Sequence, residues 1–318
     1  MLGGSLAFTL MAELAHVLTH QCDWQIVAIA RSGLVALFAA CLAYWVGARL
    51  VFVGPLRLWV RSIAGSCGML CTFFAFSRLP AADVLTLTNT FPIWVALFSW
   101  PLYGTPPGAK TMVAILVGVI GVGLVEQPHL ETGNSGVFAA LAAAVLTAVA
   151  MLGLHSLRGI DPRAIVVHFS AVAIVFCVGA YGVAAMLGTL AHPTAEVFES
   201  SVLLKLTAMG VTATIGQLLL TLAFRGGSPA KVAVVGLTQI VMARGFDIVF
   251  GAQEMDAITI MGTLLVIAPT AWLLTQPGPP DGHTTAPLNP PRTATLESEP
   301  CPNAPATDPS RATSSLHL

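Results

Sequence analysis

Charged side chains are scarce in this sequence. Asp, Glu, Lys and Arg together make up 9% of its 318 residues, against roughly 25% in an ordinary soluble domain. Hydrophobic residues make up 56%. Because so few charges could not cover the surface of a soluble protein of this length, the composition indicates an integral membrane protein that lies in the lipid bilayer.

Motifs for several other kinds of chemistry are also missing. The formal net charge is −1 and there is no basic stripe, so nucleic-acid binding is not expected. The six cysteines include no Cys-x-x-Cys pair and the histidines lack metal-ligand spacing, so we expect no metal and no cofactor. The sequence has no P-loop and no nucleophile spaced with a base, which argues against ATP hydrolysis and against an enzyme.

Long apolar runs dominate what the sequence does contain. A membrane-spanning helix needs about 20 mainly apolar residues, and turn signals such as Gly54-Pro55 separate ten such runs. Ser228 followed by Pro229 is typical of a helix start. We therefore predict an all-α polytopic membrane protein with ten transmembrane helices, at residues 2–20, 24–46, 57–78, 83–103, 110–126, 134–156, 164–190, 202–224, 230–251 and 257–275.

The two ends of the chain differ in character. The start, MLGGSLAFTL, has no Lys or Arg before its apolar run and no clear cleavage site. We therefore expect this run to stay in the membrane rather than to be removed as a signal peptide, with a true start a few residues upstream left open. Residues 276–318 are rich in Pro, Thr, Ala and Ser, which predicts a disordered cytoplasmic tail.

Lys and Arg are unevenly distributed over the expected connections. The connections opposite to the basic ones hold only Arg78 and Lys205. Because an excess of Lys and Arg marks the cytoplasmic side, we expect both termini in the cytoplasm and the protein in the plasma or inner membrane. The basic connections, with the adjoining helix ends, hold Arg49, Arg57, Arg61, Lys110, Arg158, Arg163, Arg225 and Lys231.

A short internal repeat divides the chain into halves. AFSRLPAADV at 75–84 matches AFRGGSPAKV at 223–232 with a constant offset of 148 residues. Each stretch joins the third and fourth helices of a five-helix half, and because five is odd, the halves must enter the membrane in opposite orientations. We therefore predict two inverted five-helix repeats, 1–127 and 133–275, an architecture that is typical of transporters.

Five features of the sequence form a recognisable pattern: Arg31, RSIAG, FFAFSRLPAADVLTLTNTFPIW, GVTATIGQLLLTLAF and GAQE. This pattern resembles the drug/metabolite transporter superfamily, specifically its EamA-type ten-helix transporters. The resemblance covers about residues 5–275. It implies a carrier of small organic solutes, often working outward and coupled to a proton gradient or to exchange. Two features depart from the family: WPLYGTPPG lacks the acidic residue that often ends the fourth helix, and Gln239 replaces a frequent proline.

Four ionisable residues fall inside the expected spans, where each costs about 2.5–3.5 kcal/mol on insertion scales. They are Glu13, Arg31, Arg244 and Asp247, and all four fall in one layer of the outer half of the bilayer. One interpretation is a polar cavity for a charged or zwitterionic solute, with the carboxylates open to protonation. The other is that Glu13–Arg31 and Arg244–Asp247 are neutral pairs that stabilise or gate the bundle.

Uncharged polar residues supply further candidates for solute binding. They are Asn89 and Thr90 in the run 83–103, Gln217 in the run 202–224, and Gln239 in the run 230–251. Each could bind the solute or form an ordinary hydrogen bond to a neighbouring helix. Trp94 could stack on a ring or a cation of the solute, or simply pack in the bundle.

A third group of residues has two open interpretations. Arg57 and Arg61 are expected to snorkel to the cytoplasmic interface, whereas the family resemblance offers the alternative that Arg61 faces an inner gate. His155 and His168 could relay protons, or be satisfied by hydrogen bonds at helix interfaces.

The function predicted from these features is secondary active transport of a small-molecule solute by alternating access. We expect transport to be coupled to a proton or to exchange of one solute for another. A homodimer is left open. The alternatives are an intramembrane enzyme and a channel or receptor-like membrane protein. An enzyme would need a catalytic constellation that this sequence lacks, and a channel typically repeats its pore lining across subunits.

Overall fold

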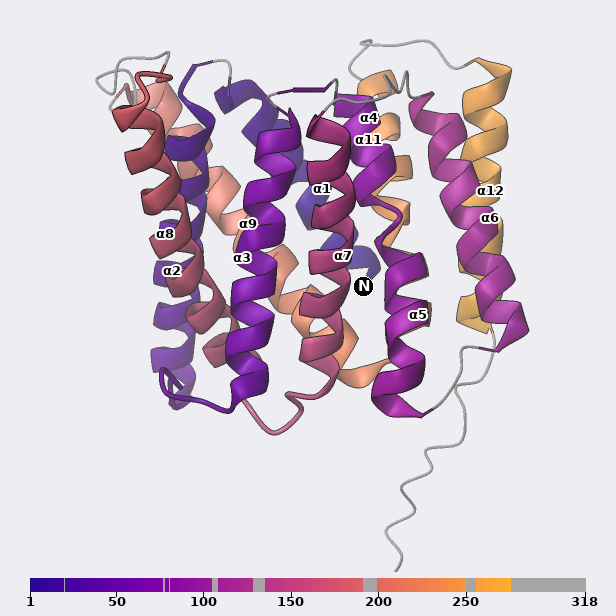
Figure 1. Ribbon diagram of the computed structural model, residues 1–318, viewed down its shortest axis with the longest axis horizontal. Coiled ribbons are helices and arrows are strands. Elements are labelled where there is room, and N and C mark those ends of the chain that lie inside the picture. Colours follow the sequence, from indigo (N-terminus) through magenta and orange to yellow (C-terminus); the bar gives the residue numbers. More distant parts are fainter. Residues whose placement is uncertain are drawn as a thin grey trace, which may run out of the picture. The chain divides into compact units, whose positions relative to one another are not determined.

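The computed structural model describes residues 1–19, 21–76, 78–79, 81–104, 108–127, 135–190, 199–249 and 256–275. Within these ranges the regular structure is α-helical, with no strand (Figure 1). All the helices lie in one compact unit, Met1–Gln276, and the predicted tail lies outside the described residues. The helices are α1 (Leu2–Thr19), α2 (Trp24–Val46), α3 (Leu56–Phe76), α4 (Ala81–Thr88), α5 (Phe91–Tyr103), α6 (Ala109–Glu126), α7 (Ser135–His155), α8 (Pro162–Met186), α9 (Ser200–Gly226), α10 (Pro229–Gly236), α11 (Thr238–Val249) and α12 (Ala257–Thr275).

Six of these helices are long and apolar enough to cross a membrane: α2, α3, α6, α7, α8 and α9. Two more, α1 and α12, contain shorter apolar stretches, Leu2–Ala15 and Ala257–Leu273. Many large hydrophobic side chains on these helices are exposed, such as Leu37, Val175 and Leu264, which is the surface expected of a bundle in lipid. The predicted all-α class with several membrane spans is therefore confirmed over the described part of the chain.

Local sequence explains several helix ends. Asp161 precedes α8 and its carboxylate accepts a hydrogen bond from the Arg163 backbone N–H at 2.8 Å, while Pro162 occupies the first turn. The C-terminal end of α2 is followed by Gly47, which has a left-handed φ of 70°. The Gly47 backbone N–H donates a hydrogen bond to the Tyr44 carbonyl. Ser228 is the N-cap residue of α10 as predicted, although its side chain makes no capping hydrogen bond.

Two runs that the sequence predicts as continuous helices are interrupted near their middle. The run 83–103 breaks between α4 and α5 at Asn89 and Thr90, which Figure 1 shows as two separate segments. Pro92 explains this break, because it has no N–H to donate to the carbonyl of Thr88, the last residue of α4. The run 230–251 breaks between α10 and α11 at Leu237 alone, where no proline intervenes.

The helices pack in pairs that join the first half of the sequence to the second. The most extensive contacts place α3 against α7, α2 against α8, α1 against α9 and α6 against α12. The α6–α12 pair approaches closely at Gly121 and Gly262, where a Cβ atom on either glycine would lie within 2.8 Å of the other's carbonyl oxygen. Small residues at such crossings let two backbones come together in a membrane bundle.

Polar contacts also join α6 and α12 at one end. The Asp256 carboxylate precedes α12 and accepts hydrogen bonds from the Thr259 backbone N–H at 2.8 Å and from the Gln127 side chain at 3.0 Å. The hydrogen bonds from Thr259, followed by that from Gln127, lower the pKa of Asp256 to about 2. Asp256 therefore remains an anion at neutral pH and caps α12 while tying it to the end of α6.

Candidate functional site

A polar cavity of about 140 Å³ lies among helices from both halves of the sequence. Its polar and aromatic lining comes from five helices: Arg31 from α2, Arg61 and Thr72 from α3, Thr147 from α7, Phe169 from α8 and Gln217 from α9. Arg31 and Gln217 were both predicted as solute-binding candidates, and the fold brings them together from positions 186 residues apart. No Asp or Glu is among the described residues that line this cavity.

Arg31 is buried with 9% of its surface exposed, and its guanidinium bonds to sulfur rather than to oxygen. Its Nε donates to Met11 Sδ at 3.1 Å, and its Nη1 donates to Met69 Sδ at 3.4 Å. A thioether sulfur is only a weak acceptor. Within the described ranges Arg31 forms no ion pair with a carboxylate, Glu13 included.

Arg61 lies still deeper, with 1% of its surface exposed. Its guanidinium carbon lies 4.3 Å from the centre of the Phe169 ring, an arrangement typical of a cation–π contact. Two glycines make room for it: a Cβ atom on Gly65 would lie 2.5 Å from Arg61 Nη1, and one on Gly153 would lie 3.1 Å from Arg61 Cβ. Its Nε and Nη1 are buried with no hydrogen-bond partner among the described residues.

The expectation that Arg61 snorkels to the membrane interface is therefore wrong. Arg57, one turn earlier on α3, is exposed as expected. The physical reason lies in two missing side chains: Gly65 on α3 leaves room beside the Arg61 guanidinium, and Gly153 lets α7 pack close to the Arg61 backbone. The RSIAG stretch carried part of this signal, since it places a glycine one turn after an arginine on the same helix face.

Gln217 completes the polar part of the cavity. Its side chain is 7% exposed and its Oε1 atom is buried without a hydrogen-bond partner in the described structure. A buried amide oxygen without a partner costs about 1–3 kcal/mol. Gln217 is thus positioned to accept a hydrogen bond from a group that enters the cavity.

Asn89, Thr90 and Trp94 do not line this cavity but lie at and beyond the α4–α5 break. Asn89 Nδ2 donates to the Leu85 carbonyl at 2.8 Å, and Thr90 Oγ1 donates to the Leu87 carbonyl at 2.6 Å. The same carbonyls also accept the backbone N–H groups of Asn89 at 2.9 Å and Thr90 at 3.2 Å, so both side chains bond back to the end of α4. Trp94 packs against a buried apolar cluster, with its ring 6.0 Å from that of Phe98.

The remaining predicted residues lie on α1 and α11, two helices that pack against each other. Glu13 and Arg244 are half-buried, and neither lines the cavity. The Gln239 carbonyl accepts a hydrogen bond from Thr9 Oγ1 at 3.1 Å, which joins α11 to α1. Asp247 belongs to α11 by its backbone, and its side chain lies outside the described residues.

His168 lies on α8 and contacts α3, but it does not line the polar cavity. Its Nδ1 is 2.8 Å from Ser62 Oγ, and its ring meets that of Trp59 edge-on with 4.7 Å between centres. A larger hollow of about 360 Å³ beside it is lined almost entirely by apolar side chains, including the exposed Ile63 and Val175. The Ser62 bond agrees with a histidine held at a helix interface.

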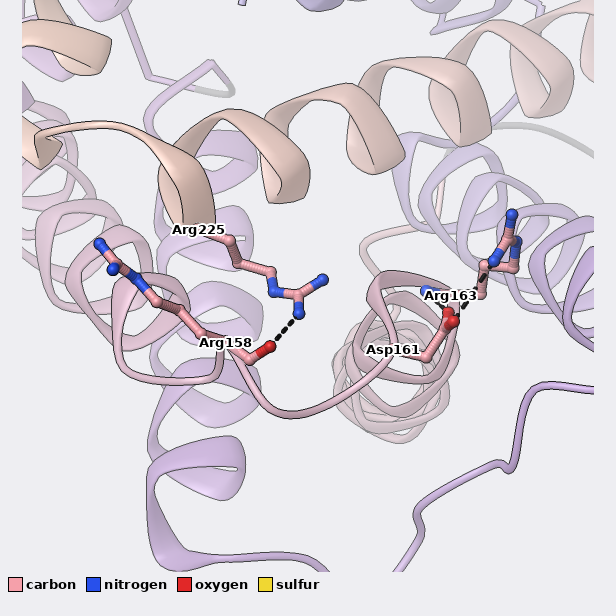
Figure 2. Close-up of polar contacts among 4 residues, drawn as sticks. All are labelled: Arg158, Asp161, Arg163 and Arg225. Atoms are coloured by element: carbon pink, nitrogen blue, oxygen red, sulfur yellow. Dashed lines mark hydrogen bonds and ion pairs between the residues drawn. The ribbon is translucent and has the colours of Figure 1, made fainter. Parts of the chain in front are cut away.

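Basic residues gather around the α7–α8 connection and the end of α9 (Figure 2). The Arg225 guanidinium donates to the Arg158 carbonyl, and Arg163 forms an ion pair with Asp161 at 3.3 Å. His155 Nδ1 lies 3.2 Å from the Phe224 carbonyl. The first two contacts tie the α7–α8 connection to the ends of α9 and α8, and the third joins the end of α7 to α9.

Comparisons with known proteins agree with this fold. The EamA-like transporter family matches residues 1–126. The pseudopaline exporter CntI of Pseudomonas aeruginosa is 30% identical over 240 residues, which cover 74% of this chain and 81% of that protein. Solute carrier family 35 member G1 of Mus musculus is 24% identical over 243 residues, which cover 69% of this chain and 62% of that protein.

A solved crystal structure shares the arrangement of helices. It superposes with a TM-score of 0.74 at 17% identity, over 86% of this chain and 97% of that chain. The apolar helices, the polar cavity among them and these relatives lead to one conclusion. The chain is a multi-pass integral membrane protein and a transporter that belongs to the EamA-like family of the drug/metabolite transporter superfamily.

Proposed function

We propose that the chain is a secondary transporter that moves a small organic solute across the membrane by alternating access. The observation that carries this proposal is a pair of helix interruptions at equivalent positions. The offset of 148 residues that relates the two halves carries Asn89, in the α4–α5 break, onto Leu237, in the α10–α11 break. Discontinuous helices at matching places in two halves are a feature of transporters, where the open backbone borders the transport path.

In this proposal α4 with α5, and α10 with α11, each form one membrane crossing, so that the chain crosses the membrane ten times. The crossings form two inverted five-helix repeats, 1–127 and 133–275, followed by the tail at 276–318. The packing supports this arrangement, because contacts recur when the halves are exchanged. Thus α3 packs on α7 while its counterpart α9 packs on α1, and α2–α8 and α6–α12 each pair counterparts with each other.

The solute site in this proposal is the polar cavity, because its lining comes from both repeats. Rocking of one repeat against the other would then open the cavity to one side of the membrane at a time. Arg31 and Gln217 would contact the solute, and the interrupted helix at Asn89 and Thr90 would border its path. Glu13, Gln239, Arg244, Asp247 and Trp94 remain proposed lining residues for other states of the cycle.

Orientation and coupling complete the proposal. In this proposal the basic group at the α7–α8 connection and the end of α9 (Figure 2) faces the cytoplasm, and both termini are proposed to lie on that side of the plasma or inner membrane. Glu13 and Asp247 are the carboxylates proposed to carry a coupling proton, with exchange as the other mode. The name of the Pseudomonas relative, an exporter, favours outward movement of a metabolite.

Counterflow in proteoliposomes tests this proposal. Purified protein is reconstituted with one unlabelled probe inside, and uptake of the same labelled probe is measured for succinate, glycerol 3-phosphate, glutamine, uridine and tetraphenylphosphonium. A transporter working by alternating access accumulates label above equilibrium only in liposomes that are preloaded with the probe. Uptake that is unaffected by preloading would instead indicate a channel, and chemical conversion of a probe would indicate an enzyme. Collapse of the pH gradient separates proton coupling from exchange.

A further inference from the structure

We propose that the solute is a small organic anion, and that its carboxylate or phosphate group binds between the guanidinium groups of Arg31 and Arg61. This inference names the substrate class of the cavity and so rests on the proposed transport function. It adds Arg61, which the sequence analysis did not include among the solute-binding residues, as a specificity-determining residue. The juxtaposition that carries it is two buried arginines on one cavity without an acid among the described lining residues.

The first step concerns the acceptors that the two guanidiniums have. An arginine side chain carries five N–H donors and cannot lose its charge in a protein. Arg31 finds two methionine sulfurs, and Arg61 finds the face of Phe169. In the described structure neither cation is matched by a carboxylate, and two nitrogens of Arg61 are buried without a partner.

The second step concerns the energy of this arrangement. A buried charge without a counter-ion is strongly unfavourable, and two like charges on one low-dielectric cavity add mutual repulsion. An ionisable residue inside the membrane is for this reason a candidate for a functional role. An anion placed between Arg31 and Arg61 would supply oxygen acceptors to both guanidiniums and remove the repulsion between them.

The third step concerns the shape of the cavity. The Arg61 guanidinium lies between Gly65 and the face of Phe169, so it is preorganised to bind a planar carboxylate or a phosphate through two parallel hydrogen bonds. Gln217 lines the same cavity and its buried Oε1 atom has no partner in the described structure, which suits a hydroxyl or ammonium donor on the solute. A volume of about 140 Å³ fits a small metabolite rather than a drug-sized molecule.

The experiment measures ligand stabilisation of the purified full-length chain in detergent. The probes form pairs that differ in charge: succinate against succinamide, and glycerol 3-phosphate against glycerol, with sodium chloride to equalise ionic strength. We expect succinate, glycerol 3-phosphate or both to raise the Tm of the wild-type protein in a saturable way, while the neutral partners do not. The two anions separate a carboxylate site from a phosphate site.

Three variants assign the effect to the cavity. Arg31→Gln and Arg61→Gln are expected to weaken the apparent affinity for the active anion at least about tenfold, because each removes charge-assisted hydrogen bonds. Arg57→Gln is the matched control, since Arg57 lies one turn away on the same helix but is exposed and outside the cavity. If Arg61→Gln does not purify as a monodisperse protein, Arg61→Lys, which keeps the charge but not the two-pronged geometry, takes its place with an expected intermediate loss.

Two results would overturn the inference: no anion stabilises the wild-type protein, or the anion stabilises the Arg31 and Arg61 variants as well as the Arg57 control. These results differ from failure of the proposed function. Counterflow of glutamine or uridine without any effect of anions would leave the transporter standing and remove the anion site. Anion binding at Arg31 and Arg61 without counterflow of any probe would support the anion site and contradict the proposed transport function.

Discussion

Arginine occurs in two contrasting settings in this molecule. Around the α7–α8 connection, Arg225 donates to a backbone carbonyl and Arg163 forms an ion pair with Asp161 (Figure 2). The side chains of Arg163 and Asp161 are 32% and 30% exposed. In the cavity, Arg31 and Arg61 are almost completely buried and contact sulfur and an aromatic ring.

The difference indicates what each group does. The arginines at the connection are partly exposed and each has an oxygen acceptor, so they stabilise the connection at little energetic cost. The buried pair has only weak acceptors in the described structure, although burial makes the need for strong ones greater. The first group is therefore expected to be structural, and the second to depend on a bound anion.

The largest expected effect comes from changing the position of a cavity arginine without changing its charge. In Gly65→Ala the new Cβ would lie 2.5 Å from Arg61 Nη1 and 2.9 Å from Phe169 Cε2, so the guanidinium must move. We expect the apparent affinity for the stabilising anion to fall at least about tenfold in the thermal-shift titration. Overpacking should also lower stability by about 1–3 kcal/mol.

Gly33→Ala is the control for that substitution. Gly33 lies on α2, and a Cβ atom there would meet nothing within 4 Å. This variant should keep the wild-type affinity and Tm or gain slightly in stability, because alanine favours a helix more than glycine does. Unchanged affinity in Gly65→Ala would show that the position of Arg61 does not matter for binding.

A smaller effect is expected at the neutral end of the cavity. Gln217→Leu keeps the approximate volume but removes the unpartnered Oε1 atom, so the protein without ligand should be as stable as wild type or more stable. The apparent affinity for the anion should fall by about two- to tenfold, the effect of one neutral hydrogen bond. Gln21→Leu serves as the control, because Gln21 bonds Lys205 away from the cavity. Equal affinities in both variants would remove Gln217 from the site.

The smallest effect is expected among the partly exposed arginines at the α7–α8 connection. Arg163→Gln removes an ion pair that contributes about 0–1 kcal/mol, so it should lower the Tm only slightly and leave anion affinity and counterflow unchanged. Asp161→Ala should lower the Tm more, because it also removes the cap of α8. Loss of such a cap lowers the free energy of unfolding by about 1 kcal/mol. A loss of transport in Arg163→Gln with normal folding would contradict the division between the two arginine groups.

Much of the fold follows from local sequence. The apolar runs predict where the helices lie, and Ser228-Pro229 and Asp161-Pro162 predict where two of them begin. The interruption at Thr90 could have been predicted as well, because Pro92 removes a backbone donor in the middle of the run. The break at Leu237 has no such signal, since Gln239 stands nearby and no proline does.

The candidate site was only partly predictable. Arg31 and Gln217 were identifiable because polar residues inside apolar runs need an explanation. Their meeting in one cavity was not, since they lie on α2 and α9, far apart in the sequence. Arg61 was missed as a cavity residue because its place near the start of a helix is also where an arginine reaches the membrane surface.

The amino-acid sequence by itself determined that this chain is a helical membrane protein, because hydrophobicity and periodic patterns act over short distances along the chain. Only the tertiary structure decided which polar residues share a space. That choice depends on which helices pack together, and packing is set by the fit of side chains at each crossing, as at Gly65 and Gly153. Because Gly65 on α3 and Gly153 on α7 lack side chains, Arg61 lies in the cavity and not at the membrane interface.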